Sequence, residues 1–351
     1  IITSNTSGLL VKELTEGMDN SFKERFFVTH FFNPPRYMKL VEIVPGSETK
    51  NDNIDLISDF LTNQLGKGVV IAKDTPNFIA NRIGVFGMMV TLKETINKKL
   101  SIEDVDALTG TLIGRPKSAT YRTADIVGLD TLTYVAKTAY DKGINDKFRD
   151  YFKLPEFIQS MIDKGWLGQK SKQGFYKKID KGVIHSLDFD TLDYKPQKKK
   201  RYKGVGLARE NTNINSKILA LVNSEDLAGE FTWEVFSKTL LYASYLVGQI
   251  SDDIVSIDNA LKWGFGWDVG PFEVWDALGF EKTLNRMKED RKEIPDWISE
   301  MFKNGSHSFY KIKDGKKHFY SFNQAKYIEF PSTDSSFSFQ SKKDQGLHLN
   351  K

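Results

Sequence analysis

The spacing of hydrophobic and polar residues predicts two kinds of structure in succession. Up to residue 75, short apolar runs at 25–30, 37–44 and 68–72 are typical of buried strands. Between the last two runs, apolar residues recur at helical spacing from about Asn51 and stop at Gly66, which predicts a helix. The opening "II" predicts the end of one more strand. This order is typical of the last part of an α/β sheet.

From Phe78 onward the pattern changes to long helical runs. Gly84 and Gly87 lie within the first of them, where the lack of a side chain allows close packing. The next pair of predicted strands falls in "GFYKKIDKGVIHSL" at 174–187. We therefore expect a second, helical domain.

The sequence of the helical part predicts an internal duplication. "LPEFIQSMIDKG" at 154–165 matches "IPDWISEMFKNG" at 294–305 in its order of apolar and polar residues. Upstream, residues 105–130 correspond to 257–280 with a small gap, and "GFYKK" corresponds to the later "SFYKI". Chance explains one such match, but three in the same order favour an internal duplication, with "YKPQKKKRYKGVGLAREN" as the connection.

Composition excludes several classes of chemistry. The 351 residues contain no cysteine, so disulfides, thiolate zinc sites and a cysteine nucleophile are all excluded. This fits a reducing compartment, and we expect the cytoplasm. No apolar stretch has the length of a membrane span, so no membrane partner is expected.

The charge pattern gives little sign of a nucleic-acid partner. The net charge is +4, and the sharpest basic run is "KKKR" at 198–201. Such a run can contact phosphates, but no aromatic platform or basic helix surrounds it, so a solvated linker is the better interpretation. The serine-rich tail from Pro331 has no core pattern.

One acidic residue interrupts an apolar strand face. Met38, Leu40, Glu42 and Val44 alternate onto the same face of the predicted strand. A carboxylate there needs a hydrogen-bonding partner, and His30, which ends "RFFVTH" before the turn "NPP", is the obvious candidate. An imidazole held by a carboxylate on one nitrogen is suited to act as a general base. The alternative is that Glu42 lies on an exposed sheet face and His30 merely ends a strand.

These residues resemble a known enzyme family. The motifs "SNTSGL", "HFFNPPRYMKLVEIV", "KDTPNFIANRI", "ADIVGLD", "QGFY" and "IDNALKWGFGWDVGPFEVWDALG" together resemble L-3-hydroxyacyl-CoA dehydrogenases. The resemblance extends to about Phe322 and is strongest to the dehydrogenase part of long bifunctional β-oxidation proteins with two helical copies. "HFFNP" followed by "KLVE" is its most specific element.

The resemblance implies a fold and a domain order. The fold class is α/β followed by all-α: the C-terminal part of a Rossmann-type NAD-binding domain and two tandem 6-phosphogluconate-dehydrogenase-like helical domains. The expected segments are the Rossmann part at 1–75, the first helical copy at 76–185, a linker at 186–215, the second copy at 216–325 and a polar tail at 326–351. The two copies are expected to pack as an internal pseudo-dimer.

The resemblance also implies an activity. The family oxidises (3S)-3-hydroxyacyl-CoA to 3-oxoacyl-CoA with NAD and without a metal. His30 matches its catalytic base and Glu42 the acid that orients the base. Ser7 matches a serine that binds the substrate oxygen beside the nicotinamide, although Thr6 or Ser7 can instead cap the following helix. Asn33 matches a residue near the nicotinamide, and Asn81 matches a substrate-oxygen ligand.

The chain departs from the family pattern in two places. No G-x-G-x-x-G stands between a strand and a helix, so the nucleotide-binding turn and the CoA contacts are expected upstream of Ile1. The isolated chain is then expected to be inactive, and an acyl-CoA-binding or assembly module without turnover is the alternative. The first helical copy has "RPKSATYRTAD" at 115–125 where the family has a "GPFE" type of sequence. A fused or associated enoyl-CoA hydratase domain is a further expected partner.

Overall fold

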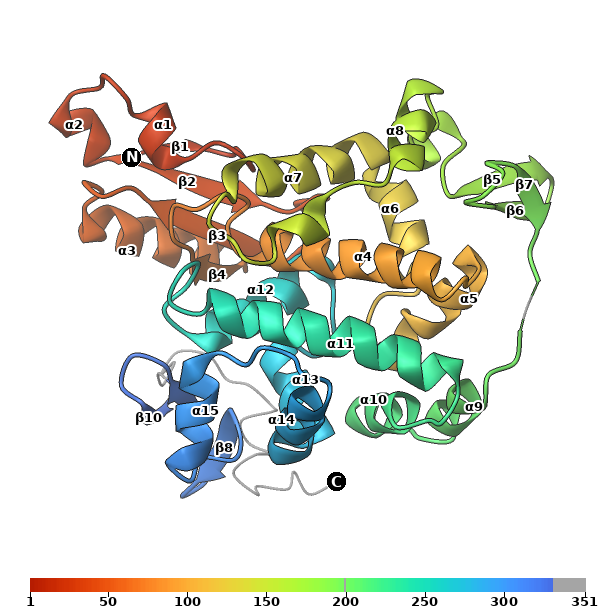
Figure 1. Ribbon diagram of the computed structural model, residues 1–351. Helices are drawn as coiled ribbons and strands as arrows, with labels where there is room; N and C mark the ends of the chain where they lie inside the picture. Colours follow the sequence, from red (N-terminus) through yellow and green to blue (C-terminus); the bar gives the residue numbers. More distant parts are fainter. Residues whose placement is uncertain (199, 331–351) are drawn as a thin grey trace, which may run out of the picture.

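The computed structural model describes residues 1–198 and 200–330 and begins with a four-stranded sheet (Figure 1). The strands lie in the order β1 (Ile2–Ser4), β2 (Phe26–Phe31), β3 (Leu40–Pro45) and β4 (Gly68–Ile71). β1 and β2 are parallel, β2 and β3 antiparallel, and β3 and β4 parallel. The helices of this sheet unit are α1 (Val11–Leu14), α2 (Asn20–Lys23) and α3 (Asn51–Asp59), which continues as the π-helical turn η1 (Phe60–Gln64).

The two faces of the sheet belong to different cores. Phe27, Val41 and Ile43 pack with Ile54 and Leu61 of the α3–η1 segment. The alternate residues, such as Val28, Leu40 and Val44, belong to the larger core shared with the helices. Glu42 lies on this second face, as the strand alternation predicts.

The strand predicted at 37–44 begins later than expected. Tyr37 is 77% exposed and belongs to a turn in which its N–H donates to the carbonyl of Pro34 at 2.9 Å. The Lys67 ammonium donates to the carbonyl of Met38 at 2.8 Å, which draws this turn toward the start of β4. β3 therefore starts only at Leu40, because consecutive prolines bend the preceding chain.

Two helical units follow the sheet. The first contains α4 (Ala80–Asn97), α5 (Ile102–Leu108), α6 (Tyr121–Val127), α7 (Leu129–Lys142), α8 (Glu156–Asp163) and a small sheet of β5 (Tyr176–Asp180), β6 (Val183–Leu187) and β7 (Tyr194–Pro196). The second contains α9 (Lys203–Arg209), α10 (Ile214–Val222), α11 (Leu227–Leu246), α12 (Ile254–Phe265), α13 (Pro271–Leu278), α14 (Phe280–Glu289), α15 (Asp296–Lys303) and a small sheet of β8 (Tyr310–Lys313), β9 (Lys316–Ser321) and β10 (Lys326–Glu329).

Some boundaries differ from those predicted. The predicted linker at 186–215 contains β7 and α9, so it contributes regular structure to both helical units. The predicted polar tail from 326 begins with β10, which pairs antiparallel with β9. The serine-rich part of that tail, residues 331–351, lies outside the described residues.

The two helical units share a polar framework. In the first, Asp106 accepts hydrogen bonds from the backbone at the start of α6 and from the Tyr176 hydroxyl at 2.8 Å. In the second, Asp258 does the same for the start of α13 and for the Tyr310 hydroxyl at 2.7 Å. Each carboxylate thus supplies the acceptors that a helix N-terminus lacks.

A second pair of aspartates repeats the correspondence. Asp125 accepts from the backbone N–H groups that open β5, at 2.8 and 2.9 Å. Asp276 accepts from those that open β8, at 2.8 to 3.0 Å. In each unit, an aspartate near the end of one helix thus bonds the backbone that opens the first strand of the small sheet.

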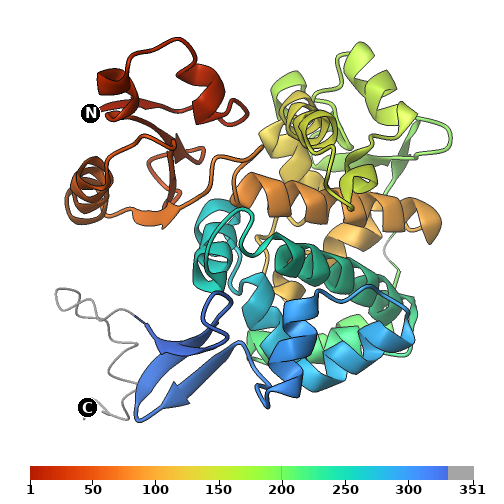
Figure 2. The same ribbon diagram turned by 60° about the vertical axis from the view of Figure 1, so that its left-hand side comes forward.

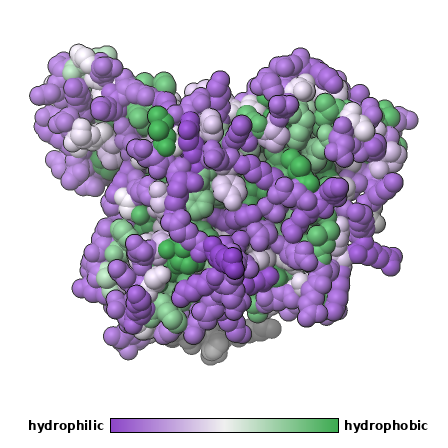
Figure 3. All heavy atoms as spheres, in the orientation of Figure 1, coloured by the Kyte–Doolittle hydropathy of each residue, from purple (hydrophilic) through white to green (hydrophobic). Residues whose placement is uncertain are grey.

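The helical units are packed against each other and against the sheet. α4 and α11 run side by side (Figures 1 and 2), and the rings of Phe86 and Tyr242 stack with 3.9 Å between centroids. α12 of the second unit lies against β3: a side chain at Gly264 would come within 2.6 Å of Leu40. Polar residues cover most of the face seen in Figure 3, with small apolar groups scattered among them.

Candidate active site

His30 and Glu42 face each other across the sheet. They are direct partners in the antiparallel register of β2 and β3, and His30 Nδ1 lies 2.7 Å from Glu42 Oε2. Glu42 is fully buried and His30 is 5% exposed. The sequence prediction that these two residues meet is confirmed, and the alternative that Glu42 lies on an exposed face is wrong. The register explains the contact, since cross-strand neighbours lie about 5 Å apart.

The second oxygen of Glu42 caps a helix. Oε1 accepts from the backbone N–H of Ile79 at 3.0 Å and of Ala80 at 2.8 Å, at the start of α4. α4 has no cap from its own N-cap side chain, so Glu42 satisfies N–H groups that would otherwise lack acceptors. The positive end of the helix dipole also favours the carboxylate. These bonds fix Glu42 and explain how a fully buried acid is tolerated.

The surroundings of His30 leave one nitrogen free. Its ring contacts the edges of Phe32 and Phe78, with 4.7 and 5.5 Å between centroids. In the neutral tautomer in which Nδ1 donates to Glu42, Nε2 has a lone pair. Within residues 1–198 and 200–330, no partner bonds Nε2. The arrangement can therefore accept a proton from a group bound beside it.

Ser7 lies in the loop that follows β1 and is half-buried. The loop is joined to the end of β2, because Asn5 Oδ1 accepts from the N–H of Phe31 at 2.8 Å. Ser7 is thus placed at the same edge of the sheet as His30, where the parallel strands β1 and β2 end.

The expected helix cap in this loop is wrong. Thr6 accepts from the N–H of Leu9 at 3.3 Å, which is a local turn. The start of α1 is instead capped by Asp74, whose two carboxylate oxygens accept from the backbone N–H groups of Val11 and Lys12 at 2.8 and 3.0 Å. An acid from the loop after β4 takes the role because it is better placed than the hydroxyls next to the helix.

The two predicted asparagines lie in different surroundings. Asn81 is half-buried on the first turn of α4, directly after the backbone groups that bind Glu42, and no described residue bonds its amide. Asn33 is exposed in the turn after β2. Both remain next to the segments that carry His30 and Glu42.

The first turn of α4 is held by a buried ion pair. Arg82 Nη2 lies 2.6 Å from Asp146, and both side chains are less than a tenth exposed. The Tyr242 hydroxyl of α11 bonds both groups, at 2.5 Å to Arg82 Nε and 2.7 Å to Asp146. The second helical unit therefore contacts the turn that carries Asn81.

Sequence reasoning missed Asn5, Asp74 and Tyr242. Asn5 lies inside the quoted motif "SNTSGL" and Asp74 inside "KDTPNFIANRI", so both could be noticed as polar residues at strand ends. Tyr242 gives no such signal, because its role depends on the packing of α11 against α4.

Over the described ranges, no group of three histidines or acids is placed to hold a metal ion. Nor does any helix there combine the length and apolarity that crossing a bilayer requires.

Comparison with known proteins identifies the family. Residues 1–75 match the family model described as "3-hydroxyacyl-CoA dehydrogenase, NAD binding domain", and residues 78–178 match "3-hydroxyacyl-CoA dehydrogenase, C-terminal domain". The chain belongs to the 3-hydroxyacyl-CoA dehydrogenase family, with a Rossmann-like NAD-binding domain followed by a helical domain.

Similar curated proteins carry related descriptions. A probable 3-hydroxyacyl-CoA dehydrogenase of Bacillus subtilis is 47% identical over 320 residues, which cover 91% of this chain and 40% of that protein. A protein of the same description from Deinococcus radiodurans is 44% identical over 51% of each chain. A putative fatty acid oxidation complex trifunctional enzyme of Rickettsia felis is 32% identical over 78% of this chain and 37% of its own length. The chain thus spans about two fifths to one half of these relatives.

A solved structure shares the fold. The 3-hydroxybutyryl-CoA dehydrogenase of Escherichia coli superposes with a TM-score of 0.61 at 18% identity, over 87% of this chain and 76% of that one. At this identity the similarity concerns the fold alone.

Proposed function

We propose that this chain carries the proton-transfer site of an NAD-dependent dehydrogenase that oxidises (3S)-3-hydroxyacyl-CoA to 3-oxoacyl-CoA. The observation that carries the proposal is the bond of 2.7 Å between His30 and a Glu42 that is itself fixed by α4. Family membership supports the substrate class and the cofactor.

His30 acts as the general base. The hydroxyl proton of the substrate passes to Nε2 of His30. At the same time the hydrogen on the carbon that bears this hydroxyl leaves as a hydride, and the C–O single bond becomes a carbonyl. Glu42 stabilises the imidazolium that forms and holds the ring in the tautomer that presents a free Nε2. When bound, NAD accepts the hydride.

The geometry fits the nicotinamide end of the cofactor. Ser7 and Asn33 follow the carboxyl ends of the parallel strands β1 and β2, and His30 is the last residue but one of β2; this is the edge at which α/β sheets bind nucleotides. We assign Ser7 and Asn81 to the substrate oxygen, and Asn33 together with Ser7 to the nicotinamide. No described residue bonds the amide of Asn81, which leaves it available as a ligand.

The test is His30→Gln in the active enzyme, with His185→Gln on β6 as the matched control. Because glutamine cannot accept the proton, we expect kcat to fall by at least about a hundredfold while NAD affinity, measured by calorimetry, changes little. An unchanged kcat would refute the assignment. Acyl-CoA binding without turnover in both wild type and variant would favour the alternative of a binding or assembly module.

We further propose that the helical units are two copies of one domain, with a first copy near 76–185 and a second near 216–325, packed as an internal pseudo-dimer. The repeated hydrogen bonds of Asp106 and Asp258 support the duplication. The side-by-side packing of α4 and α11 supports the pseudo-dimer. A tethered partner forms such an interface at lower entropic cost than a second subunit.

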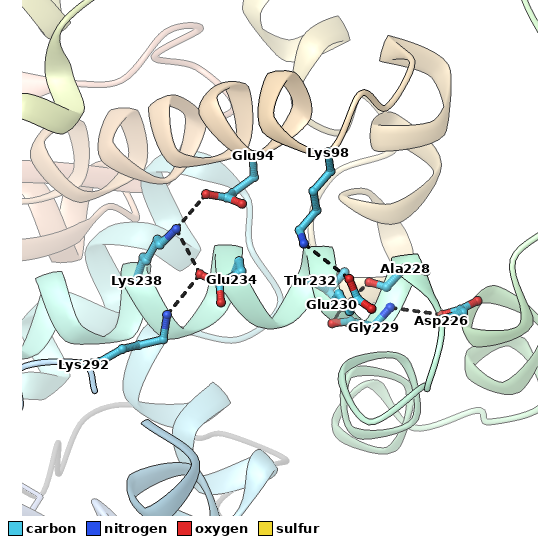
Figure 4. A network of polar contacts seen from close by, with 10 residues as sticks. All are labelled: Glu94, Lys98, Asp226, Ala228, Gly229, Glu230, Thr232, Glu234, Lys238 and Lys292. Atoms are coloured by element: carbon cyan, nitrogen blue, oxygen red, sulfur yellow. Dashed lines mark hydrogen bonds and ion pairs between the residues drawn. The ribbon is translucent and has the colours of Figure 1, made fainter. Parts of the chain in front are cut away.

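The second copy has a structural role in this scheme. Glu234 of α11 corresponds to Asn81 of α4, but it bonds Lys238 and Lys292, each at 3.0 Å (Figure 4). Lys238 in turn bonds Glu94 of α4 at 2.7 Å and so links the copies. The description of the trifunctional relative supports a fused or associated enoyl-CoA hydratase domain as a partner. A cytoplasmic location stays a prediction.

A further inference from the structure

Two consecutive residues before α4 have a left-handed backbone. Asn77 and Phe78 have φ angles of 64° and 53°, although neither is a glycine. Asparagine tolerates this conformation, whereas it is unfavourable for a bulky residue such as phenylalanine. Such a turn persists only where contacts with the rest of the protein hold it in place.

This turn contacts both residues of the proposed proton-transfer site. The ring of Phe78, which is 1% exposed, meets the His30 ring edge to face with 5.5 Å between centroids. The next two residues, Ile79 and Ala80, donate their backbone N–H groups to Glu42 Oε1. The shape of the turn therefore affects how His30 and Glu42 are held.

The side chain of Asn77 attaches the turn to α7. Its Nδ2 donates to the backbone carbonyl of Val135, in the middle of α7, at 2.9 Å. Both residues are buried, so the low local dielectric strengthens this bond. α7 thus fixes a turn that lies 58 positions earlier in the sequence.

Stability alone does not explain an asparagine at this position. Asn77 Oδ1 is buried and has no hydrogen-bond donor among the described residues. A buried amide oxygen without a donor is unfavourable, and a glycine would adopt the same φ without burying a polar atom. What asparagine provides and glycine does not is the bond to Val135.

We propose that Asn77 is a positioning residue for the dehydrogenase reaction, which acts through Phe78 on His30. The inference rests on the proposed function, in which His30 is the general base. The bond of 2.7 Å between Nδ1 and Glu42 holds the imidazole at one point only and leaves the ring free to tilt. Phe32 and Phe78 pack against the ring and restrict this tilt. Asn77 keeps Phe78 in place by fixing the left-handed turn to α7.

The first test is Asn77→Gly in the active enzyme, because glycine keeps the left-handed backbone and removes the bond to Val135. We expect kcat to fall by about tenfold, since a small misplacement of a catalytic group costs up to about a hundredfold. The KM for NAD and the Tm should change little. A merely structural role of Asn77 would lower the Tm and leave kcat intact, and an unchanged kcat would overturn the proposal.

Asn53→Ala in α3 is the matched control. The Asn53 side chain also donates to a backbone carbonyl, that of Glu24, at 3.0 Å. However, α3 covers the face of the sheet opposite Glu42, so the loss of this bond should leave kcat unchanged. An equal fall of kcat in Asn53→Ala and Asn77→Gly would show that the effect is not specific to the turn and would overturn the proposal.

Phe78→Leu tests the path from Asn77 to the base. The variant removes the aromatic ring from the contact with His30, so kcat should fall by a factor similar to that of Asn77→Gly. Adding Asn77→Gly to Phe78→Leu should then lower kcat by no more than about twofold further, because the two residues act in series. Full additivity of the two losses would overturn the proposal, and so would a full kcat in Phe78→Leu.

His30→Gln distinguishes a failure of this proposal from a failure of the proposed function. A full kcat in His30→Gln refutes the general base and the positioning role with it. A loss of kcat in His30→Gln together with a full kcat in Asn77→Gly refutes the positioning role alone.

Discussion

The Tyr242 hydroxyl bonds Arg82 Nε at 2.5 Å and thereby joins α11 of the second helical unit to the first turn of α4. Arg82 follows Asn81 directly, and the same turn begins with the N–H groups that bind Glu42. The second unit therefore helps to hold the backbone on which the proposed site is built, although it contributes no reacting group in our scheme.

Tyr242→Phe should identify a positioning role. The variant keeps the ring stacked on Phe86 but leaves Arg82 and Asp146 without the hydroxyl, so we expect a stability loss of about 1–2 kcal/mol. Because the first turn of α4 loosens, kcat should fall a few-fold with little change in the KM for NAD. The control is Tyr245→Phe on the same helix. A loss of stability with an unchanged kcat would show that Tyr242 is purely structural.

Glu42→Gln should inactivate the enzyme without removing the helix cap. The amide oxygen can still accept from Ile79 and Ala80, but the amide nitrogen would donate to His30 Nδ1 and place the ring proton on Nε2. His30 then has no lone pair for the substrate proton. We expect kcat to fall at least about a hundredfold, measured at saturating substrate, with a Tm close to that of the wild type. A fall in Tm with normal kcat would mean that Glu42 serves α4 alone.

The proposed site is largely predictable from sequence where it depends on local pattern. His30 and Glu42 lie 12 positions apart in two strands joined by a turn, so strand alternation and the cost of burying an acid are enough to pair them. Asp125 and Asp276 are also visible in the sequence as matching positions of the proposed repeat.

Contacts between distant segments are not predictable in this way. The cap of α4 joins residues 37 and 38 positions apart, and Tyr242 reaches Arg82 across 160 positions. Nothing in the local sequence of α11 distinguishes Tyr242 from any other buried aromatic residue. The observed start of β3 differs from the predicted one for a related reason. "YMK" has strand-like alternation, but the prolines before it and the hydrogen bond from Lys67 to Met38 place these residues in a turn.

Stability should depend on pH through two matched aspartates. Burial raises the pKa of Asp276 from 3.8 to about 7 and that of Asp125 from 3.8 to about 6. Between pH 3.8 and about 7 for Asp276, and between pH 3.8 and about 6 for Asp125, the folded state keeps a proton that the unfolded state has lost. The free energy of unfolding therefore falls as pH rises, by at most about 1.4 kcal/mol per pH unit for each group.

Variants separate the two contributions. Asp276→Asn should reduce the slope up to about pH 7, and Asp125→Asn only up to about pH 6. Part of the slope should remain, because burial also raises the pKa of Asp258 to about 8 and that of Asp106 to about 6. Urea unfolding at several pH values measures this, with the exposed Asp55→Asn as control. If both variants retain the full wild-type slope, these carboxyls are ionised in the folded protein throughout.

Glu234→Ala should affect stability more than catalysis. Burial alone would raise the pKa of Glu234, but hydrogen bonds from Lys238 and Lys292 outweigh it and lower the pKa. Removing the carboxylate leaves two half-buried ammonium groups with fewer partners, at a cost of about 1 kcal/mol. We expect kcat/KM to change by no more than a few-fold. Glu230→Ala removes a carboxylate that is 65% exposed and 3.5 Å from Lys98 (Figure 4), and should change neither quantity measurably. A large loss of kcat/KM in Glu234→Ala would show that the second helical unit contributes to the reaction.

Gly84→Ala should test the contact between α4 and α12, since a side chain carbon at Gly84 would lie 2.2 Å from the ring of Phe265. That ring contacts Phe32, at 6.3 Å between centroids, and Phe32 contacts His30, so it cannot move without disturbing the surroundings of the base. We expect a loss of about 1–3 kcal/mol in the free energy of unfolding, together with a lower kcat.

The matched control is Gly206→Ala in α9, where a side chain would meet nothing within 4 Å. There the substitution should stabilise the protein by about 0.5–1 kcal/mol, because alanine favours the helix more than glycine does. Denaturant unfolding of both variants gives the comparison. If Gly84→Ala also stabilised the protein, α12 would not pack on α4 in solution, and the path of aromatic contacts from the second helical unit to His30 would be lost with it.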